Sequence, residues 1–560
     1  NSSFINRLLD PETDSKWLAQ NPYIRMKSEK KEILLPKNIF GTRLNSSGID
    51  LSEKQNLENL SVKLAKFKDK KINAESIYFG RNKSADRKFK ASSISSNIDM
   101  GTINFDDPKD IKDCLEKNNS NEWEKINVKK RTEILNRVAD SIEKDPYELI
   151  FYLINEAGKT IQNAVDEIRE GVDFLRYYAE QALKIIEERE LEGPTGEENK
   201  ILYSPKGRFL CISPWNFPVA ILIGQISAAL SCGNKVIAKP SEHTSILGYL
   251  VVRKFHECGV PLSALELILG DGLYGDMLTK INSLQGVAFT GSLPTAKKIQ
   301  SNLIENQNQI VPLIAETGGI NSMLVDSSAL LEQVTDDVIR SAFDSAGQRC
   351  SALRVLCIQE EIYEELVEMI KGNMITQKIG DPNNFDTDIG PIITKQSIEK
   401  LNKYIDKCRE QNFDVFQATK NTDGMHISPT LITINKISDI KNEQFGPILH
   451  LLKYKSNNTD KLINDINKTG YGLTMGIHSR IESRADYFGK QSNIGNIYIN
   501  RDMVGAVVGS QPFGGVGLSG SGFKAGGPNY LLQFLNEKVI SKNSVAFGGN
   551  TELLNLQEDL

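Results

Sequence analysis

The chain has 560 residues, a formal net charge of −5 at pH 7, 39% hydrophobic residues and 25% charged residues. This composition is typical of a globular protein with enough apolar side chains for several cores. The acidic balance and the scattered lysine-rich runs speak against a nucleic-acid partner, which would select clustered basic residues. No uninterrupted apolar run of about 18 residues occurs, so the sequence predicts no membrane span.

The seven cysteines form no CxxC pair, and the five histidines are not spaced as metal ligands. This pattern predicts reduced thiols in a cytoplasmic compartment, without a disulfide framework and without a metal site. The first residue is Asn rather than Met, so we expect a processed chain or a fragment.

Residues 1–75 are polar and are interrupted by several prolines and glycines. We predict that they form an N-terminal wrap of extended chain and short helices rather than a domain. From about Asp107 to Tyr178, apolar residues recur at spacings of three and four, which indicates amphipathic helices.

From Gly207 onward, short β-rich runs bounded by Gly, Pro, Ser or Asn alternate with helical stretches, and the alternation restarts after Asp326. Alternation of this kind is typical of parallel βαβ units. The sequence therefore predicts an α/β protein with two open-sheet domains, residues 76–318 and 319–499. The glycine-dense segment 505–527 predicts a loop that closes over a site.

The stretch Ser341–Arg354 carries Cys350 beside small residues, and IAETGG carries Glu316 before two glycines. Small neighbours leave a thiolate open to a substrate, and a nucleophile paired with a carboxylate base is the arrangement of covalent catalysis. A single cysteine is more often a small buried apolar residue, so Cys350 alone does not decide between the two roles.

Seven short motifs settle that choice, and all occur in the order found in the aldehyde dehydrogenase superfamily, which the chain resembles over about residues 100 to 540. They are SPWNFP (Ser213–Pro218), KPSE (Lys239–Glu242), FTGS (Phe289–Ser292), ETGG (Glu316–Gly319), GQRC (Gly347–Cys350), EQFGP (Glu443–Pro447) and QPFGG (Gln511–Gly515). The resemblance implies the aldehyde dehydrogenase fold, with an NAD-binding Rossmann-like domain at 76–318 joined by part of 500–535. Residues 319–499 would form the domain that carries the cysteine nucleophile.

The runs FDSAGQRCSALR, MVGAVVGSQPFGG and KAGGPNYLL resemble the L-glutamate γ-semialdehyde (Δ1-pyrroline-5-carboxylate) dehydrogenases, and especially the dehydrogenase half of bifunctional proline utilization A proteins. That resemblance implies a β-hairpin oligomerisation arm from residues 188–206 and 535–560, with ILYS and SVAF as candidate strands. A homodimer or higher homo-oligomer is then expected. A proline dehydrogenase domain would lie N-terminal to this chain or on a separate chain, and FAD would bind only there.

The resemblance also assigns catalytic roles. Cys350 would attack the aldehyde carbon, and the Asn216 side chain with the Cys350 backbone N–H would form an oxyanion hole, where one donor contributes roughly 3–4 kcal/mol. Glu316 would activate water to hydrolyse the thioester. Without the resemblance, the local sequence would predict only a turn residue at Asn216 and a solvent-exposed loop carboxylate at Glu316.

A GxGxxG match at Gly270–Gly275 is weak, because no acidic residue follows at the end of a second strand. The family instead implies that Lys239 and Glu242 bind the adenosine ribose, which favours NAD+ over NADP+, and that Thr290–Ser292 meet the pyrophosphate at a helix N-terminus. The expected cofactor residues are Ile212, Pro214, Trp215, Lys239, Ser241, Glu242, Thr290, Gly291, Ser292, Gly318, Glu443 and Phe445.

A substrate with an α-carboxylate needs anion donors away from Cys350. The resemblance implies Ser351 and the backbone N–H groups of Gly505 and Ala506 for this task, with Phe217 and Phe513 on the aliphatic part. The expected substrate residues are Phe217, Arg349, Ser351, Gly505, Ala506 and Phe513.

The predicted function is oxidation of L-glutamate γ-semialdehyde to L-glutamate with NAD+, the second step of proline catabolism. Three alternatives stay open at this stage. They are a dehydrogenase of another small carboxylated aldehyde, a cysteine hydrolase or acyltransferase without nicotinamide, and a non-catalytic protein that keeps the fold.

Overall fold

The computed structural model of the protein describes residues 34–81, 86–96, 98–117, 122–419, 424–505, 507–544 and 546. The chain divides into two units, residues 1–47 and 48–560. The described part of the first unit includes the short 3-10 helix η1 (Pro36–Asn38). The wrap predicted for residues 1–75 falls partly on residues 1–33, which lie outside the described residues. All elements below belong to the second unit.

Helix α4 (Lys54–Ala65) is followed by a three-stranded sheet in the order β1-β3-β2. Its strands are β1 (Ile72–Glu75), β2 (Arg87–Ser92) and β3 (Asp99–Phe105). This sheet was not predicted from the sequence. The reason is that β2 exposes most of its side chains and buries only Ala91, so it lacks the apolar alternation that marks a half-buried strand.

The first α/β half contains a five-stranded parallel sheet in the order β10-β9-β6-β7-β8. The strands are β6 (Arg208–Ile212), β7 (Lys235–Lys239), β8 (Leu265–Leu267), β9 (Gly286–Thr290) and β10 (Leu313–Glu316). Its helices are α5 (Pro108–Lys117), α6 (Val128–Lys144), α7 (Tyr147–Asn155), α8 (Ile161–Ile185), α9 (Ala220–Ser231), α10 (Ser245–Glu257), α11 (Gly272–Leu278) and α12 (Leu293–Asn306). Every residue of β7 and β8 is buried, as expected for a parallel sheet covered on both faces.

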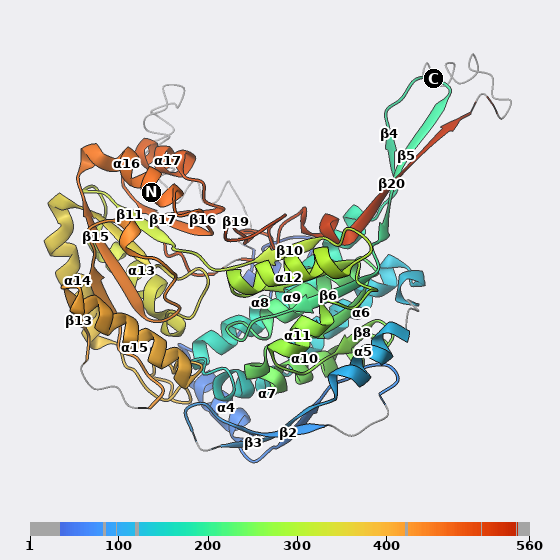
Figure 1. Ribbon diagram of the computed structural model, residues 1–560, viewed down its shortest axis with the longest axis horizontal. Coiled ribbons are helices and arrows are strands. Elements are labelled where there is room, and N and C mark those ends of the chain that lie inside the picture. The colour runs from blue at the N-terminus through green and yellow to red at the C-terminus, as the bar shows by residue number, and fades with distance from the viewer. Residues whose placement is uncertain are drawn as a thin grey trace, which may run out of the picture. The chain divides into compact units, whose positions relative to one another are not determined.

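The second α/β half contains a seven-stranded sheet in the order β13-β14-β15-β12-β11-β17-β18, parallel except for the edge strand β13. The strands are β11 (Ser322–Val325), β12 (Val355–Gln359), β13 (Val415–Gln417), β14 (Thr430–Thr433), β15 (Ile448–Tyr454), β17 (Thr474–His478) and β18 (Asn496–Ile499). The helices are α13 (Leu331–Phe343), α14 (Tyr363–Thr376), α15 (Lys395–Glu410), α16 (Thr459–Asn467) and α17 (Glu482–Gln491). Figure 1 shows the two halves side by side, and the predicted pair of open α/β sheets is confirmed.

Each half has its own hydrophobic core. The buried apolar residues from Ile320 to Met503 cluster around the seven-stranded sheet, and those up to Ala315 cluster around the five-stranded one. After the second core the chain returns to the first, because Val508 and the residues Tyr530–Leu535 pack there. On the way it forms β19 (Val516–Gly517), which pairs with β16 (Tyr471–Gly472). The glycine-rich segment therefore passes between the two halves.

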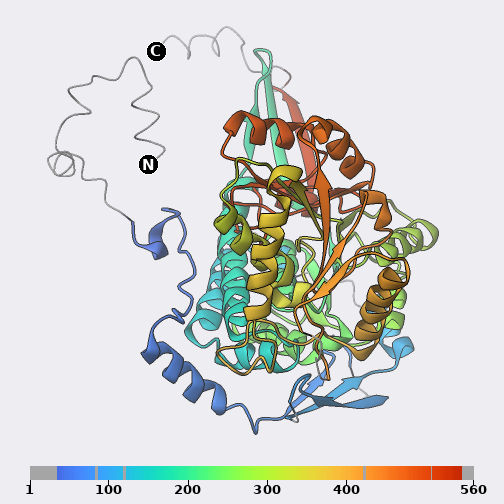
Figure 2. The ribbon, with the colours of Figure 1, turned by 90° about the vertical axis from the view of Figure 1, so that its left-hand side faces the viewer.

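Three antiparallel strands form an arm, in the order β20-β5-β4. They are β4 (Arg189–Leu191), β5 (Glu197–Pro205) and β20 (Leu535–Asn543). Figures 1 and 2 show the arm reaching away from the two sheets, at the end opposite the small β1–β3 sheet. The candidate strand ILYS lies in β5, as predicted. In SVAF, Ser544 follows the end of β20, and Val545 and Phe547 lie outside the described residues. Within the described ranges, no helix has the length and apolar character needed to cross a membrane.

Candidate active site

Cys350 lies in a tight turn between the 3-10 helix η4 (Asp344–Gly347) and β12. Ser345, Ala346 and Gly347 all have left-handed backbones, with φ of 53°, 54° and 66°. A β-carbon at Gly347 would collide with the backbone oxygen of Gly446, so only glycine fits there. Left-handed Ser and Ala each cost on the order of 1 kcal/mol or more, a kind of strain that gathers at functional sites.

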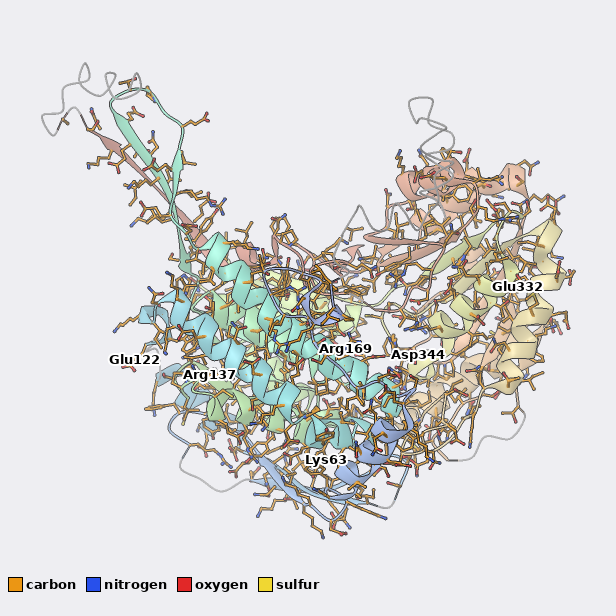
Figure 3. The ribbon with its side chains drawn as sticks, turned by 180° about the vertical axis from the view of Figure 1, so that it is seen from behind. Lys63, Glu122, Arg137, Arg169, Glu332 and Asp344 are labelled. Atoms are coloured by element: carbon orange, nitrogen blue, oxygen red, sulfur yellow. The ribbon has the colours of Figure 1, made fainter. Side chains whose placement is uncertain are left out.

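Side chains from the first half hold this turn in place. Asn163 of α8 donates to Asp344 Oδ1 at 2.8 Å and accepts from the Ser345 hydroxyl. Figure 3 shows Asp344 where the two halves meet, whereas Glu332 lies out on the second half. The turn that carries the nucleophile is therefore fixed across the junction of the two halves.

Arg354 holds the same turn through hydrogen bonds to its backbone, and this residue was not predicted from the sequence. Its guanidinium is 1% exposed and donates to the carbonyl oxygens of Gly347 and Arg349 at 2.8 and 2.9 Å. It also donates to Glu443 Oε1 at 3.0 Å, which ties the EQFGP motif to the nucleophile turn. The available signal was an arginine directly before the largely apolar strand VLCIQ, where a buried charge must have partners.

One cavity of about 90 Å³ brings the predicted nucleophile and base together. Cys350 and Glu316 both line it, and so do four of the predicted substrate residues, namely Phe217, Ser351, Gly505 and Phe513. Sequence reasoning did not single out several other residues of its wall: Glu170, Phe174, Tyr178, Gln225, Thr317, Ala525 and Tyr530. Thr317 directly follows Glu316 in the ETGG motif, whereas the others come from α8, α9 and the C-terminal segment, whose approach in space no local pattern predicts.

The cavity raises the pKa of both reacting side chains. Burial raises the pKa of the Cys350 thiol to about 12, and the carboxylates Glu443, Glu316 and Glu170 add to the effect. Burial also raises the pKa of Glu316 to about 8, against the lowering by the Gly515 N–H and by Lys524. Cys350 is therefore a thiol at neutral pH in this state, and Glu316 changes its charge close to the physiological range.

Asn216 lies in the loop between β6 and α9, directly before the cavity residue Phe217. Its side-chain amide is 8% exposed and donates to the carbonyl oxygen of Gln348 at 3.2 Å. Gln348 precedes Cys350 by two residues, so the amide lies next to the nucleophile turn. An amide nitrogen carries two hydrogens, so this contact leaves one N–H for a ligand.

One predicted substrate residue stands apart from the cavity. Arg349 does not line it, because its guanidinium pairs with Asp344 Oδ2 at 2.7 Å and with the Ser345 hydroxyl at 3.1 Å. It lies over the Phe217 ring, 5.4 Å from the centroid, while the Lys159 ammonium lies 3.8 Å from the same centroid. Two cations therefore hold the Phe217 ring. Ala506 lies outside the described residues.

A second cavity of about 380 Å³ lies at the carboxyl ends of β6, β7 and β9. Nine predicted cofactor residues line it: Ile212, Pro214, Trp215, Lys239, Ser241, Glu242, Thr290, Gly291 and Ser292. Thr290 lines both this cavity and the one at Cys350, so the two are neighbours. The carboxyl edge of a parallel sheet is where α/β folds bind nucleotides.

The other three predicted cofactor residues, Gly318, Glu443 and Phe445, do not line this cavity. The Phe445 ring packs edge-on against Trp215 at 5.7 Å between centroids. Glu443 lies against Gly318, where any β-carbon would collide with its carboxylate. Gly272 and Gly275 of the GxGxxG match do line the cavity, but from the short helix α11.

The polar groups of this cavity fit a dinucleotide. The Ser213 hydroxyl is buried, lines the cavity and has no hydrogen-bond partner, so it is available to a ligand. The Lys239 ammonium is also buried, donates to the Pro240 oxygen at 3.2 Å and lies 4.0 Å from Glu242 Oε2. Ser292 caps α12, where free backbone N–H groups favour anionic phosphate.

Comparison with known proteins agrees with this geometry. Residues 82–540 match the aldehyde dehydrogenase family. The chain is 39% identical over 577 residues to the bifunctional protein PutA of Escherichia coli, covering 97% of this chain and 42% of that protein. It therefore spans less than half the length of that relative. It is 31% identical to the 1-pyrroline-5-carboxylate dehydrogenase of Oceanobacillus iheyensis, covering 88% of this chain and 98% of that one.

Solved structures give the same result. A variant of Bradyrhizobium japonicum proline utilization A superposes with a TM-score of 0.85 at 38% identity, covering 98% of this chain and 54% of that chain. A 1-pyrroline-5-carboxylate dehydrogenase variant from Thermus thermophilus superposes with a TM-score of 0.84 at 27% identity, covering 89% and 98%. With this fold and this pair of adjoining cavities, the chain belongs to the aldehyde dehydrogenase family.

Proposed function

We propose that this chain oxidises L-glutamate γ-semialdehyde to L-glutamate with NAD+, as the second step of proline catabolism. The observation that carries the proposal is that Cys350 and Glu316 line one small cavity, which adjoins the cavity of the nine expected dinucleotide residues. The printed names of the 1-pyrroline-5-carboxylate dehydrogenase and PutA relatives support the choice of substrate.

In the proposed reaction, the Cys350 thiol loses its proton to solvent, its sulfur bonds to the aldehyde carbon, and the carbonyl oxygen becomes an oxyanion. The free N–H of Asn216 and the Cys350 backbone N–H donate to that oxygen. Lys239, Glu242 and the α12 N-terminus would hold NAD+, which when bound would supply the acceptor for the hydride that leaves this adduct. Glu316 then takes a proton from water as the water oxygen attacks the resulting thioester, and the Cys350 sulfur departs as glutamate forms.

The cofactor preference follows from charge. Glu242 borders the cofactor cavity and is 40% exposed at its side chain, so its carboxylate is free to accept ribose hydroxyls. It would repel a 2′-phosphate, and we therefore propose NAD+ rather than NADP+.

The walls of the cavity suit a short amino acid aldehyde. Phe217 and Phe513 would flank the methylene groups, while Ser351 with the backbone N–H groups at residues 505 and 506 would take the α-carboxylate. Glu170 lies on the same wall and is the carboxylate available to pair with the α-ammonium group. Its pKa is raised to about 7, first by burial and then by Glu167, so a cationic partner would favour its ionised form.

The direct test measures NADH absorbance with purified protein. We expect kcat/KM for glutamate semialdehyde to exceed that for succinate semialdehyde by at least about 10-fold, since the latter lacks the ammonium group. We also expect NAD+ to be used in preference to NADP+. Equal rates with the two aldehydes would favour a broader dehydrogenase, and no NADH from any aldehyde would favour a hydrolase or a non-catalytic protein.

Replacing Glu170 by Gln tests the ammonium contact. A charge-assisted hydrogen bond contributes about 1.5–3 kcal/mol, so Glu170→Gln should lower kcat/KM for glutamate semialdehyde by roughly 10-fold or more. The value for succinate semialdehyde should stay within about 2-fold, because that substrate has no group to pair with the carboxylate. An equal loss for both aldehydes would assign Glu170 to structure instead.

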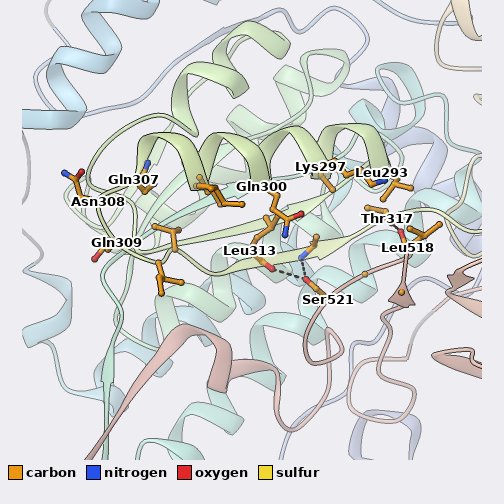
Figure 4. A pocket seen from close by; sticks show the side chains of 18 residues that line it. Leu293, Lys297, Gln300, Gln307, Asn308, Gln309, Leu313, Thr317, Leu518 and Ser521 are labelled. Carbon is orange, nitrogen blue, oxygen red and sulfur yellow. Dashed lines mark hydrogen bonds between the residues drawn. The ribbon is translucent and has the colours of Figure 1, made fainter.

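We further propose that the chain assembles with a second copy through its arm. Val539 and Ile540 of β20 are exposed apolar residues, and β20 is an edge strand. A groove of about 700 Å³ along α12 and the edge strand β10 would offer a complementary surface, and Figure 4 shows its lining residues, Leu313 and Leu518 among them. Ile304 and Ile310 of this groove are also strongly exposed.

This assembly predicts that a Val539→Glu and Ile540→Glu double variant remains folded but has a lower mass by light scattering than the wild type. An unchanged mass would show that the arm is not part of the interface.

Where the chain occurs with a proline dehydrogenase, that partner would supply the FAD chemistry and the substrate. We propose a reducing, cytoplasmic compartment, supported by seven cysteines that are all free thiols.

A further inference from the structure

Lys524 is a charged residue beside the catalytic cavity that the reaction scheme leaves unused. Its ammonium nitrogen donates to the carbonyl oxygens of Gly495 and Gly514 at 2.6 and 2.7 Å, and to Asn496 Oδ1 at 3.0 Å. These three contacts use all three hydrogens of an ammonium ion. The geometry therefore requires the charged form of Lys524, although burial lowers its pKa.

The Gly514 carbonyl belongs to the peptide group whose N–H is that of Gly515. This N–H donates to Glu316 Oε2 at 3.0 Å. A single peptide group thus links the ammonium on its oxygen side to the Glu316 carboxylate on its nitrogen side. Hydrogen bonds in such a chain polarise one another, so the ammonium strengthens the N–H as a donor to the carboxylate.

The glycines of this turn allow the contact to be close. A β-carbon at Gly514 would lie 2.7 Å from Glu316 Oε1, and one at Gly520 would lie 2.9 Å from Oε2. Asn496 reinforces the turn, because it donates to the Pro512 oxygen at 2.7 Å and accepts from the Gly514 N–H at 3.2 Å. The carboxylate therefore rests against bare backbone whose position Lys524 and Asn496 fix together.

The titratable groups that interact electrostatically with Glu316 are Lys524, the Cys350 thiol and the Tyr530 hydroxyl. Cys350 and Tyr530 are neutral at physiological pH, since burial raises the pKa of each. Lys524 is then the one cation of this set, and with the Gly515 N–H it opposes the effect of burial on Glu316.

We propose that Lys524 is a positioning residue for the base: through the Gly514–Gly515 peptide, its ammonium ion orients the Glu316 carboxylate and favours its anionic form. The proposal rests on the proposed role of Glu316 in thioester hydrolysis. Lys524 itself touches neither substrate nor cofactor in this scheme. Its contribution is to keep the base ionised at a pH where burial alone would protonate it.

The test compares Lys524→Gln and Lys524→Met, which are neutral, with Lys524→Arg, which keeps the charge. The steady-state rate that follows the first NADH turnover is measured from pH 6 to pH 10. Loss of a nearby opposite charge raises a carboxyl pKa by about 1 unit or more. The acid limb of the pH–rate profile should therefore move to higher pH by that amount in both neutral variants. At pH 7 their rate should fall about 10-fold, and it should recover at high pH.

Several controls make the outcome decisive. The first NADH turnover and the KM for NAD+ should stay near wild type, and thermal melting should confirm that the variants fold. Lys524→Gln retains two donors and is the variant of choice if Lys524→Met does not fold. The acid limb of Lys524→Arg should remain close to that of wild type. The inference would be overturned if the acid limb of the pH–rate profile stayed in place in a folded neutral variant, or if it shifted equally in Lys524→Arg.

The Glu316→Gln variant distinguishes the role proposed for Lys524 from the role proposed for Glu316. If Glu316→Gln retained wild-type hydrolysis, the base assignment itself would be wrong, whatever Lys524 does. If Glu316→Gln lost hydrolysis while the neutral Lys524 variants kept the wild-type pH profile, only the role of Lys524 would be rejected.

Discussion

Replacing Cys350 by Ala should abolish NADH formation from glutamate semialdehyde, with kcat/KM lower by at least about 10⁴-fold. The reason is that no other thiol lines the cavity at residues 316 and 350, so the covalent adduct cannot form. The measurement is NADH absorbance at saturating NAD+, together with calorimetric binding of NAD+, which should be unchanged because Cys350 does not line the cofactor cavity.

The matched control is Cys258→Ala. Like Cys350, Cys258 is partly exposed, but it ends helix α10 and contacts the Arg137 carbonyl oxygen at 3.7 Å. Its removal should leave kcat/KM within about 2-fold of wild type, as is usual away from an active site. Turnover in Cys350→Ala at the wild-type rate would show that another group attacks the aldehyde, and the proposed chemistry would be abandoned.

Replacing Glu316 by Gln should separate the two halves of the reaction. Glutamine has the shape of the acid but cannot take a proton from water, so thioester hydrolysis should slow by about 10²–10⁴-fold. The adduct with Cys350 still forms, and a rapid burst of about one NADH per subunit should precede the slow phase. Stopped-flow absorbance records both phases, and mass spectrometry of the quenched protein should find the acyl group on residue 350.

Glu156→Gln is the control for a buried acid. Burial raises the pKa of Glu156 to about 8, as it does for Glu316, but Glu156 accepts from the backbone N–H groups of Ile246 and Leu247 and lines neither cavity. Its amide variant should keep the wild-type slow phase. Absence of a burst in Glu316→Gln would place its role before hydride loss and contradict the assignment as hydrolytic base.

The parts of the site that the sequence predicted are those where chemistry concentrates in short motifs. Glu316 and the nine cofactor residues each lie at the end of a buried strand or in the turn after it, so strand order alone brings them to one edge of the five-stranded sheet. Cys350 instead lies in the turn before β12, and its motif rather than strand order identified it. The two α/β halves could also be predicted, because short, largely apolar runs alternate with helical ones.

What the sequence did not reveal depends on pairings between distant residues. Arg349 carried a family role, but its partner Asp344 is known only once the left-handed turn has folded. Glu170 and Lys524 look like ordinary surface charges in the sequence. Their importance comes from burial and from contacts with residues far along the chain, which no local spacing encodes. Strand β2 was missed because its exposed arginine and lysines obscured the alternation.

The base of the arm has a consequence for how turnover depends on assembly. Tyr530 lines the catalytic cavity, and β20 begins at Leu535, after the 3-10 helix η8 (Tyr530–Phe534). The strand that would contact a second copy in the proposed assembly therefore begins directly beside the wall of the catalytic cavity. If that assembly forms, dilution that separates the copies should loosen this wall, so the specific activity should fall with protein concentration, in step with the fall in mass measured by light scattering.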